Sequence, residues 1–148
     1  MDSFELDVRR HVYFSVVANG RPPTTTETAA VFATGESEIA EAYRRLHDAH
    51  ALVLFPDTTD IWMANPFCFA PTPHRVTAGA KTWTGTCCWD ALGIPGALHS
   101  DGEIVTECAC CGDTLELVVR TGELVVGADV LCHVLVPARG WWDDIGFT

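Results

Sequence analysis

A proline-rich stretch near the middle of the chain most constrains how it can fold. Residues 65–76 read NPFCFAPTPHRV and contain three prolines, Pro66, Pro71 and Pro73. Proline lacks a backbone N–H, so such a run marks a linker or a crossing strand. Helical periodicity precedes the stretch and short strand-like runs follow it. We therefore predict an α+β fold with a helical lobe over residues 1–64 and a mostly antiparallel sheet lobe over residues 65–148.

The first lobe has the pattern of three helices and a hairpin. Over residues 4–18 apolar residues recur every four positions, at Phe4, Val8, Val12 and Val16. A capping box over residues 24–27 opens a second helix that we expect to stop at Gly35. Residues 36–51 form a third amphipathic pattern, and residues 52–66 give two strand-like runs around a Pro-Asp turn. This order of elements resembles a winged helix.

Charge argues against a DNA-binding function for this lobe. The third helix carries Arg44 and Arg45 against three acids, Glu38, Glu41 and Asp48. The whole chain has 20 acids against 9 lysines and arginines, a formal net charge of −11. Such a chain repels a polyanion, so we assign the lobe a structural role and expect no nucleic-acid partner. A metal-responsive transcription regulator is therefore the weakest of the functions considered.

The composition places the protein in the cytoplasm. No apolar run approaches the ~20 residues that span a bilayer, so we expect no membrane association. The first residues, MDSFELDVRR, carry acids where a secretory signal carries positive charge. The chain has seven cysteines, an odd number. For a cytosolic chain, thiols kept free for metal binding or chemistry are favoured over a disulfide framework.

The second lobe reads as short strands interrupted by one helix. The helix is expected from about Cys87 to Leu92, closed by the GIPG stretch at residues 93–96. Another strand is expected in VLCHVLVP, residues 130–137. The final stretch GWWDDIGFT, residues 140–148, has the pattern of a lead into a further strand.

A thiol and an acid at the start of that helix are the main candidates for chemistry. Cys87 and Asp90 are three residues apart and so share a helix face. A helix N-terminus favours a thiolate, while apolar neighbours raise the pKa of a carboxyl group and keep it protonated. A soft nucleophile beside a proton donor suits binding a soft metal and protonating its leaving group. The alternative is that Cys87 and Cys88 are small buried apolar residues and Asp90 a helix-terminal charge.

An ordered series of motifs resembles the organomercurial (alkylmercury) lyase family. The series runs NPFCFAPTPHRV, KTWTGTCCWDALGIPGAL, VTECACCG and LELVV, and the resemblance covers roughly residues 60–120. It implies cleavage of a carbon–mercury bond to a hydrocarbon and Hg(II), without an organic cofactor and with mercury as substrate metal. By position, Cys87 is the thiol that binds mercury and Asp90 the acid that protonates the departing carbon. Cys108 matches a family cysteine of structural role.

The family also uses a second catalytic thiol, in a strand near its C-terminal end. No cysteine is assigned to that place here, and the sequence stops at Thr148. We therefore expect the functional form to continue beyond Thr148, either through a UGA codon read as selenocysteine or in a longer chain that has been lost. Other thiols that could bind mercury with Cys87 are Cys88, Cys108 and Cys111.

A structural zinc site is a less favoured alternative for the same cysteines. Cys108 and Cys111, in CACCG, have the spacing of half a zinc knuckle. The other half would need two more ligands, such as Cys132 with His133 or Cys87 with Cys88. A second CxxC motif is absent from the sequence.

The sequence thus favours an organomercurial lyase acting on a small organomercurial. A mercuric reductase or another thiol acceptor would then receive the Hg(II). The competing hypothesis is a non-catalytic thiol protein that binds a soft or structural metal, Hg or Zn.

Overall fold

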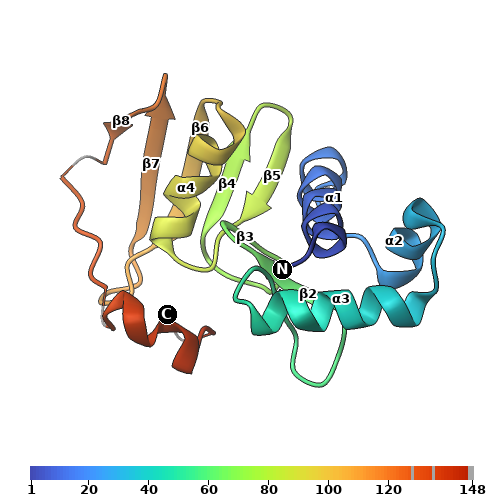
Figure 1. Cartoon of the computed structure of the whole chain (residues 1–148). Helices are drawn as coiled ribbons and strands as arrows, with labels where there is room; N and C mark the ends of the chain where they lie inside the picture. Colours follow the sequence, from blue (N-terminus) through green and yellow to red (C-terminus); the bar gives the residue numbers. More distant parts are fainter. Residues whose placement is uncertain (128, 135, 147–148) are drawn as a thin grey trace. The chain divides into compact units, whose positions relative to one another are not determined.

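The structure is a computed structural model that describes residues 1–127, 129–134 and 136–146 (Figure 1). The chain divides into two compact units, Met1–Ala64 and Asn65–Thr148. The peptide bond between Asn65 and Pro66, at the start of the second unit, is cis. No helix in the described part of the chain is both long enough and apolar enough to cross a membrane.

The longest helix of the first unit has a complete cap at each end. Helix α1 (Ser3–Asn19) begins after Asp2, whose side chain accepts a hydrogen bond from the Glu5 N–H while the Glu5 side chain accepts one from Asp2. It ends at Gly20, whose φ of 73° is a left-handed conformation that glycine adopts without strain. The expected apolar stripe is buried, at Val8, Val12 and Val16. The carboxylate of Glu5 also pairs with Arg45, 2.5 Å away on helix α3 (Glu36–Asp48).

The second and third helices follow the sequence prediction except at their ends. Helix α2 (Thr25–Phe32) has the expected capping box. It ends in a left-handed Ala33, so the prediction of Gly35 as its stop was wrong: Gly35 is the N-cap of α3 (Glu36–Asp48). In the helix pair the Thr28 and Tyr43 hydroxyls are 2.7 Å apart. Burial raises the pKa of Tyr43 to about 12, so its phenol is neutral. The contact between the two hydroxyls joins α2 to α3.

A short hairpin completes the first unit. Strands β1 (Val53–Leu54) and β2 (Ile61–Ala64) pair antiparallel, as the sequence predicted. The rings of Phe55 and Trp62 stack near its turn, with centroids 5.4 Å apart.

The second unit is built on a five-stranded antiparallel sheet. The strands are β4 (Arg75–Ala78), β5 (Lys81–Thr84), β6 (Gly102–Glu107), β7 (Thr114–Arg120) and β8 (Glu123–Val126). Their order in the sheet is β5-β4-β6-β7-β8. A short strand β3 (Phe67–Cys68) precedes them, and Phe67 packs against Trp83 of β5. Helices followed by an antiparallel sheet confirm the predicted α+β class.

One helix crosses from β5 to β6 over a face of this sheet. Helix α4 (Cys88–Leu98) lies against β4 and β6 (Figure 1). It extends beyond Leu92, so the prediction that GIPG closes it was wrong. Ile94 and Pro95 are buried, and Pro95 packs so tightly on Gly102 that a side chain at position 102 would collide with it. This packing outweighs the helix-breaking tendency of Pro95.

The C-terminal segment departs from the sequence prediction. Of residues 130–137, those that the structure describes form no strand, and Leu131 is 93% exposed. The stretch after them begins with a 3₁₀ helix, η1 (Ala138–Asp143), rather than a lead into a strand. Residues 135, 147 and 148 lie outside the described residues.

Candidate functional site

A tight turn after β5 places Cys87 at the start of α4. Cys87 is the N-cap residue, and its carbonyl accepts the first helical hydrogen bond, 3.0 Å from the Ala91 N–H. The turn is fixed by Gly85, whose N–H donates to the His74 carbonyl and whose carbonyl accepts from Thr72. A Cβ at Gly85 would lie 2.6 Å from the backbone nitrogen of Ala91. Only glycine therefore allows β5 to run this closely into α4.

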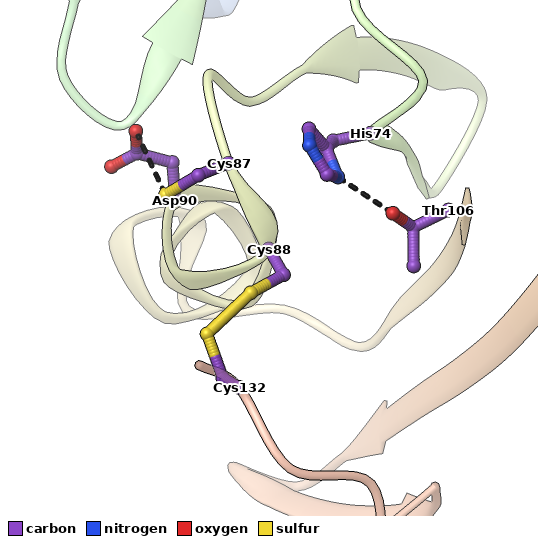
Figure 2. The surroundings of a disulfide bond; sticks show 6 residues. All are labelled: His74, Cys87, Cys88, Asp90, Thr106 and Cys132. Atoms are coloured by element: carbon purple, nitrogen blue, oxygen red, sulfur yellow. Dashed lines mark hydrogen bonds between the residues drawn. A yellow bond between two sulfur atoms is a disulfide. The ribbon is translucent and has the colours of Figure 1, made fainter. Parts of the chain in front are cut away.

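The structure brings the two predicted side chains together. The Cys87 thiol donates to Oδ2 of Asp90 at 3.8 Å, within the wider range of sulfur hydrogen bonds (Figure 2). Both residues are half-buried, whereas Trp89 between them is exposed. The helical spacing thus produces the shared face that the sequence indicated.

Burial sets the protonation of both groups. It raises the pKa of the Asp90 carboxyl group, in the direction the sequence analysis expected. It also raises the pKa of the Cys87 thiol, and the nearby Asp90 charge adds to this shift. The prediction that the helix N-terminus makes Cys87 a thiolate was therefore wrong, because desolvation outweighs the backbone N–H groups here. The resting pair holds its protons more firmly than free side chains do.

The neighbouring Cys88 forms a disulfide with Cys132 (Figure 2). The two residues are 44 positions apart, and the bond holds the segment after β8 against the first turn of α4. For this pair the expectation of free thiols was wrong, and the bond removes Cys88 as a mercury ligand in the oxidised state. The free cysteines among the described residues are Cys68, Cys87, Cys108, Cys110 and Cys111.

Cys132 is the residue near the site that sequence reasoning missed. The sequence offers Cys132 only as a possible zinc ligand with His133, because cysteine pairing cannot be deduced from spacing. The disulfide joins its sulfur to Cys88, the residue that follows Cys87 in the chain. A signal existed in the sequence: Cys132 is a lone cysteine in an apolar run close to the C-terminal end.

A histidine at the same end of the sheet was also missed. His74 precedes β4, and its Nδ1 lies 2.6 Å from the hydroxyl of the buried Thr106 on β6 (Figure 2). Burial lowers the pKa of His74, which favours the neutral ring at pH 7. This contact joins the start of β4 to the end of β6 beside the Cys87 turn.

The remaining candidates, Cys108 and Cys111, lie in the turn between β6 and β7. Within the described ranges, the structure contains no group of three or more His, Cys, Asp or Glu side chains that could hold a metal ion. Cys88 and Cys132, two of the residues considered as further zinc ligands, are bonded to each other instead.

Comparisons with known proteins agree with the motif series. A sequence model of the alkylmercury lyase family, MerB, matches residues 67–148. Among solved structures, the mercury-bound form of MerB2 is similar with a TM-score of 0.69 and 22% sequence identity. That match covers 84% of this chain and 60% of the other, so the chain spans less than two thirds of MerB2. At this identity the likeness supports the fold. No curated protein matches the chain significantly.

Proposed function

Because the chain belongs to the alkylmercury lyase family, we propose that it cleaves carbon–mercury bonds, with Cys87 capturing mercury and Asp90 protonating the departing carbon. The observation that carries the proposal is the 3.8 Å contact between the Cys87 sulfur and the Asp90 carboxylate. Thiolate sulfur is the ligand that soft metals prefer, and a carboxyl group with a raised pKa is a suitable proton donor.

The contact allows one proton to serve both steps. When an organomercurial cation R–Hg⁺ binds, the Cys87 sulfur forms the S–Hg bond and its proton passes to Asp90. Asp90 then returns this proton to the carbon as the C–Hg bond breaks. The products are the hydrocarbon R–H and Hg(II) bound to the Cys87 sulfur, and mercury keeps its oxidation state throughout. The Asp90 carboxylate left behind is an oxygen ligand beside the new metal ion.

A second sulfur would hold the Hg(II) product more tightly than an oxygen ligand. We assign this role to Cys132 in the reduced protein, since its sulfur is bonded to the residue that follows Cys87. A dithiol reductant supplies the two electrons and two protons that open the disulfide and leave Cys88 and Cys132 as thiols. Cys132 then binds the mercury on Cys87 and gives its proton to a solvent base. The oxidised form would be the resting, slow state. The released Hg(II) then passes to a mercuric reductase or another thiol acceptor.

Two substitutions test the proton donor and the mercury thiol separately. Asp90→Asn should still bind phenylmercury but release benzene more slowly by on the order of 10²–10⁴-fold, because an amide does not donate the proton. Cys87→Ser should lose turnover and bind one phenylmercury fewer per chain than wild type, since the other free cysteines remain. Benzene in the headspace measures cleavage, and retained mercury after gel filtration measures binding. Equal turnover in wild type and Asp90→Asn would remove the acid assignment.

The same assay separates the competing function. A non-catalytic thiol protein that binds mercury or zinc takes up phenylmercury but releases no benzene. Mercury uptake by the reduced wild-type chain without any hydrocarbon would therefore favour that alternative.

A further inference from the structure

We propose that the turn between β6 and β7 is a second soft-metal site, in which Cys108 and Cys111 hold one Hg(II) between two thiolates. The site is separate from Cys87 and Asp90. The choice of Hg(II) as its ligand rests on the proposed function, because that reaction produces this ion.

Backbone hydrogen bonds shape the turn as a sulfur-binding loop. The Cys108 N–H donates to the Asp113 carbonyl and the Gly112 N–H donates to the Cys108 carbonyl, both at 2.8 Å. Gly112 has a φ of 74°, which closes the turn in a left-handed conformation. The chain therefore folds back so that position 111 returns over position 108.

The turn directs hydrogen-bond donors at one sulfur. The backbone N–H groups of Cys110 and Cys111 and the thiol of Cys111 all interact with the Cys108 sulfur, and together they lower the pKa of Cys108. Consecutive N–H groups pointing at one atom form a nest for an anion, here a thiolate. The Cys111 sulfur in turn lies 3.2 Å from Oδ2 of Asp113. The turn therefore brings the sulfurs of Cys108 and Cys111 into contact with each other.

The donor set selects the kind of metal. A structural zinc ion takes four ligands, and no group of three candidate ligands occurs among the residues that the structure describes. Two thiolates without further ligands suit a soft cation with a low coordination number, such as Hg(II). Cys111 is exposed and Cys108 half-buried, so the ion can reach the site from solvent.

The topology places this turn at the same end of the sheet as Cys87. Thr84 at the end of β5 pairs with Arg75 at the start of β4, and Arg75 pairs with Val105 near the end of β6. Cys87 follows the end of β5, and Cys108 follows the end of β6. One strand separates β5 from β6, a spacing of about 10 Å. The His74–Thr106 contact spans the same edge.

This placement suggests a route for the product ion. Transfer to the turn forms two new Hg–S bonds, to Cys108 and Cys111, and breaks the bond to the Cys87 sulfur. The two thiols give up two protons, of which one returns to Cys87 and the other goes to a solvent base. Mercury remains Hg(II), so the transfer needs no oxidant or reductant.

Mercury retention in a Cys87→Ser background tests the site apart from the lyase reaction. The oxidised full-length protein is loaded with HgCl₂ and passed through gel filtration in excess iodide, which strips Hg(II) from single thiols. The Cys87→Ser chain should keep about one Hg(II) per molecule, with two sulfur neighbours in its X-ray absorption spectrum. Adding Cys111→Ser should remove that ion. Adding Cys110→Ser, the matched control one residue away, should leave it in place.

Two results would overturn the proposal. One is no retained mercury in Cys87→Ser, and the other is equal retention with Cys111→Ser and with Cys110→Ser. Neither result bears on cleavage, because benzene release by chains that keep Cys87 is measured separately. We expect Cys111→Ser alone to release benzene in a single turnover as fast as wild type.

Discussion

At the scale of single residues, the surroundings of Cys87 and Asp90 decide how strongly each side chain holds its proton. The two side chains are three positions apart in one helical turn, which any sequence with this spacing would provide. Partial burial then raises the pKa of both groups. In the proposed reaction, the raised pKa of the thiol would slow capture, and the raised pKa of Asp90 would help its carboxylate to take up the thiol proton.

The raised thiol pKa predicts the pH dependence of capture. Below that pKa the reactive thiolate falls tenfold per pH unit, so labelling of Cys87 by iodoacetamide should still be rising above pH 9. Removing the Asp90 charge should move the profile to lower pH. Mass spectrometry of the Cys87 peptide at each pH gives the rate, and a short unstructured peptide with one cysteine serves as the reference. A Cys87 profile that coincides with that of the reference peptide would contradict the prediction.

The raised pKa of Asp90 also predicts a stability cost. A folded-state pKa above the unfolded value favours the folded protein below the unfolded pKa, and this advantage is lost as pH rises through the folded pKa. At pH 7 the native chain therefore carries a partly desolvated carboxylate. Asp90→Asn should raise Tm at pH 7 and change it little near pH 3. Calorimetry at pH 3 and pH 7 tests this prediction. A lower Tm for Asp90→Asn than for wild type at pH 7 would contradict it.

At the scale of elements, the site depends on how β5 joins α4. The backbone of Gly85 lies against the first turn of the helix, so no side chain fits there. The tightly packed Pro95 and Gly102 then hold the helix on the sheet. The position of Cys87 is therefore fixed from both ends of α4.

Two glycine substitutions probe this junction. Gly85→Ala should displace the start of α4, lowering both the free energy of unfolding and benzene release, because the new Cβ would lie 2.6 Å from the Ala91 nitrogen. Gly96→Ala is the matched control in the same helix, where a Cβ meets nothing within 4 Å. It should be neutral or stabilising by up to about 1 kcal/mol, the helix preference of alanine over glycine. Urea unfolding and the activity assay together test the pair, and similar losses in both variants would refute the role of Gly85.

At the scale of the whole molecule, one disulfide ties the end of the chain to the site. The bond between Cys88 and Cys132 closes a loop with a sequence separation of 44 residues. A loop of this size stabilises by about 4 kcal/mol in the chain-entropy description. If Cys132 has the proposed role, stability and reactivity oppose each other, because this thiol is free only when the bond is open.

Reduction should therefore lower stability and raise activity at the same time. Dithiothreitol should reduce the urea midpoint of wild type while increasing benzene release. Cys88→Ser, which leaves Cys132 as a free thiol, should be active without reductant. Cys132→Ser should gain nothing from reductant, although its stability loss is the same. Equal activity of Cys88→Ser and Cys132→Ser would show that Cys132 has no part in the reaction.

The sequence by itself determined the local features of this protein. Capping at Thr24 and Glu27, the change from helices to strands near Pro66 and the shared face of Cys87 and Asp90 all follow from interactions within a few residues. The motif series likewise identified the family that the sequence model matches.

Only the tertiary structure decided what depends on distant contacts. It paired Cys88 with Cys132, extended α4 through Pro95, joined His74 to Thr106 and reversed the expected pKa shift of Cys87. Each of these outcomes depends on burial or on segments far apart in the chain. Spacing and periodicity report neighbours along the chain, whereas desolvation and disulfide pairing are set by neighbours in space.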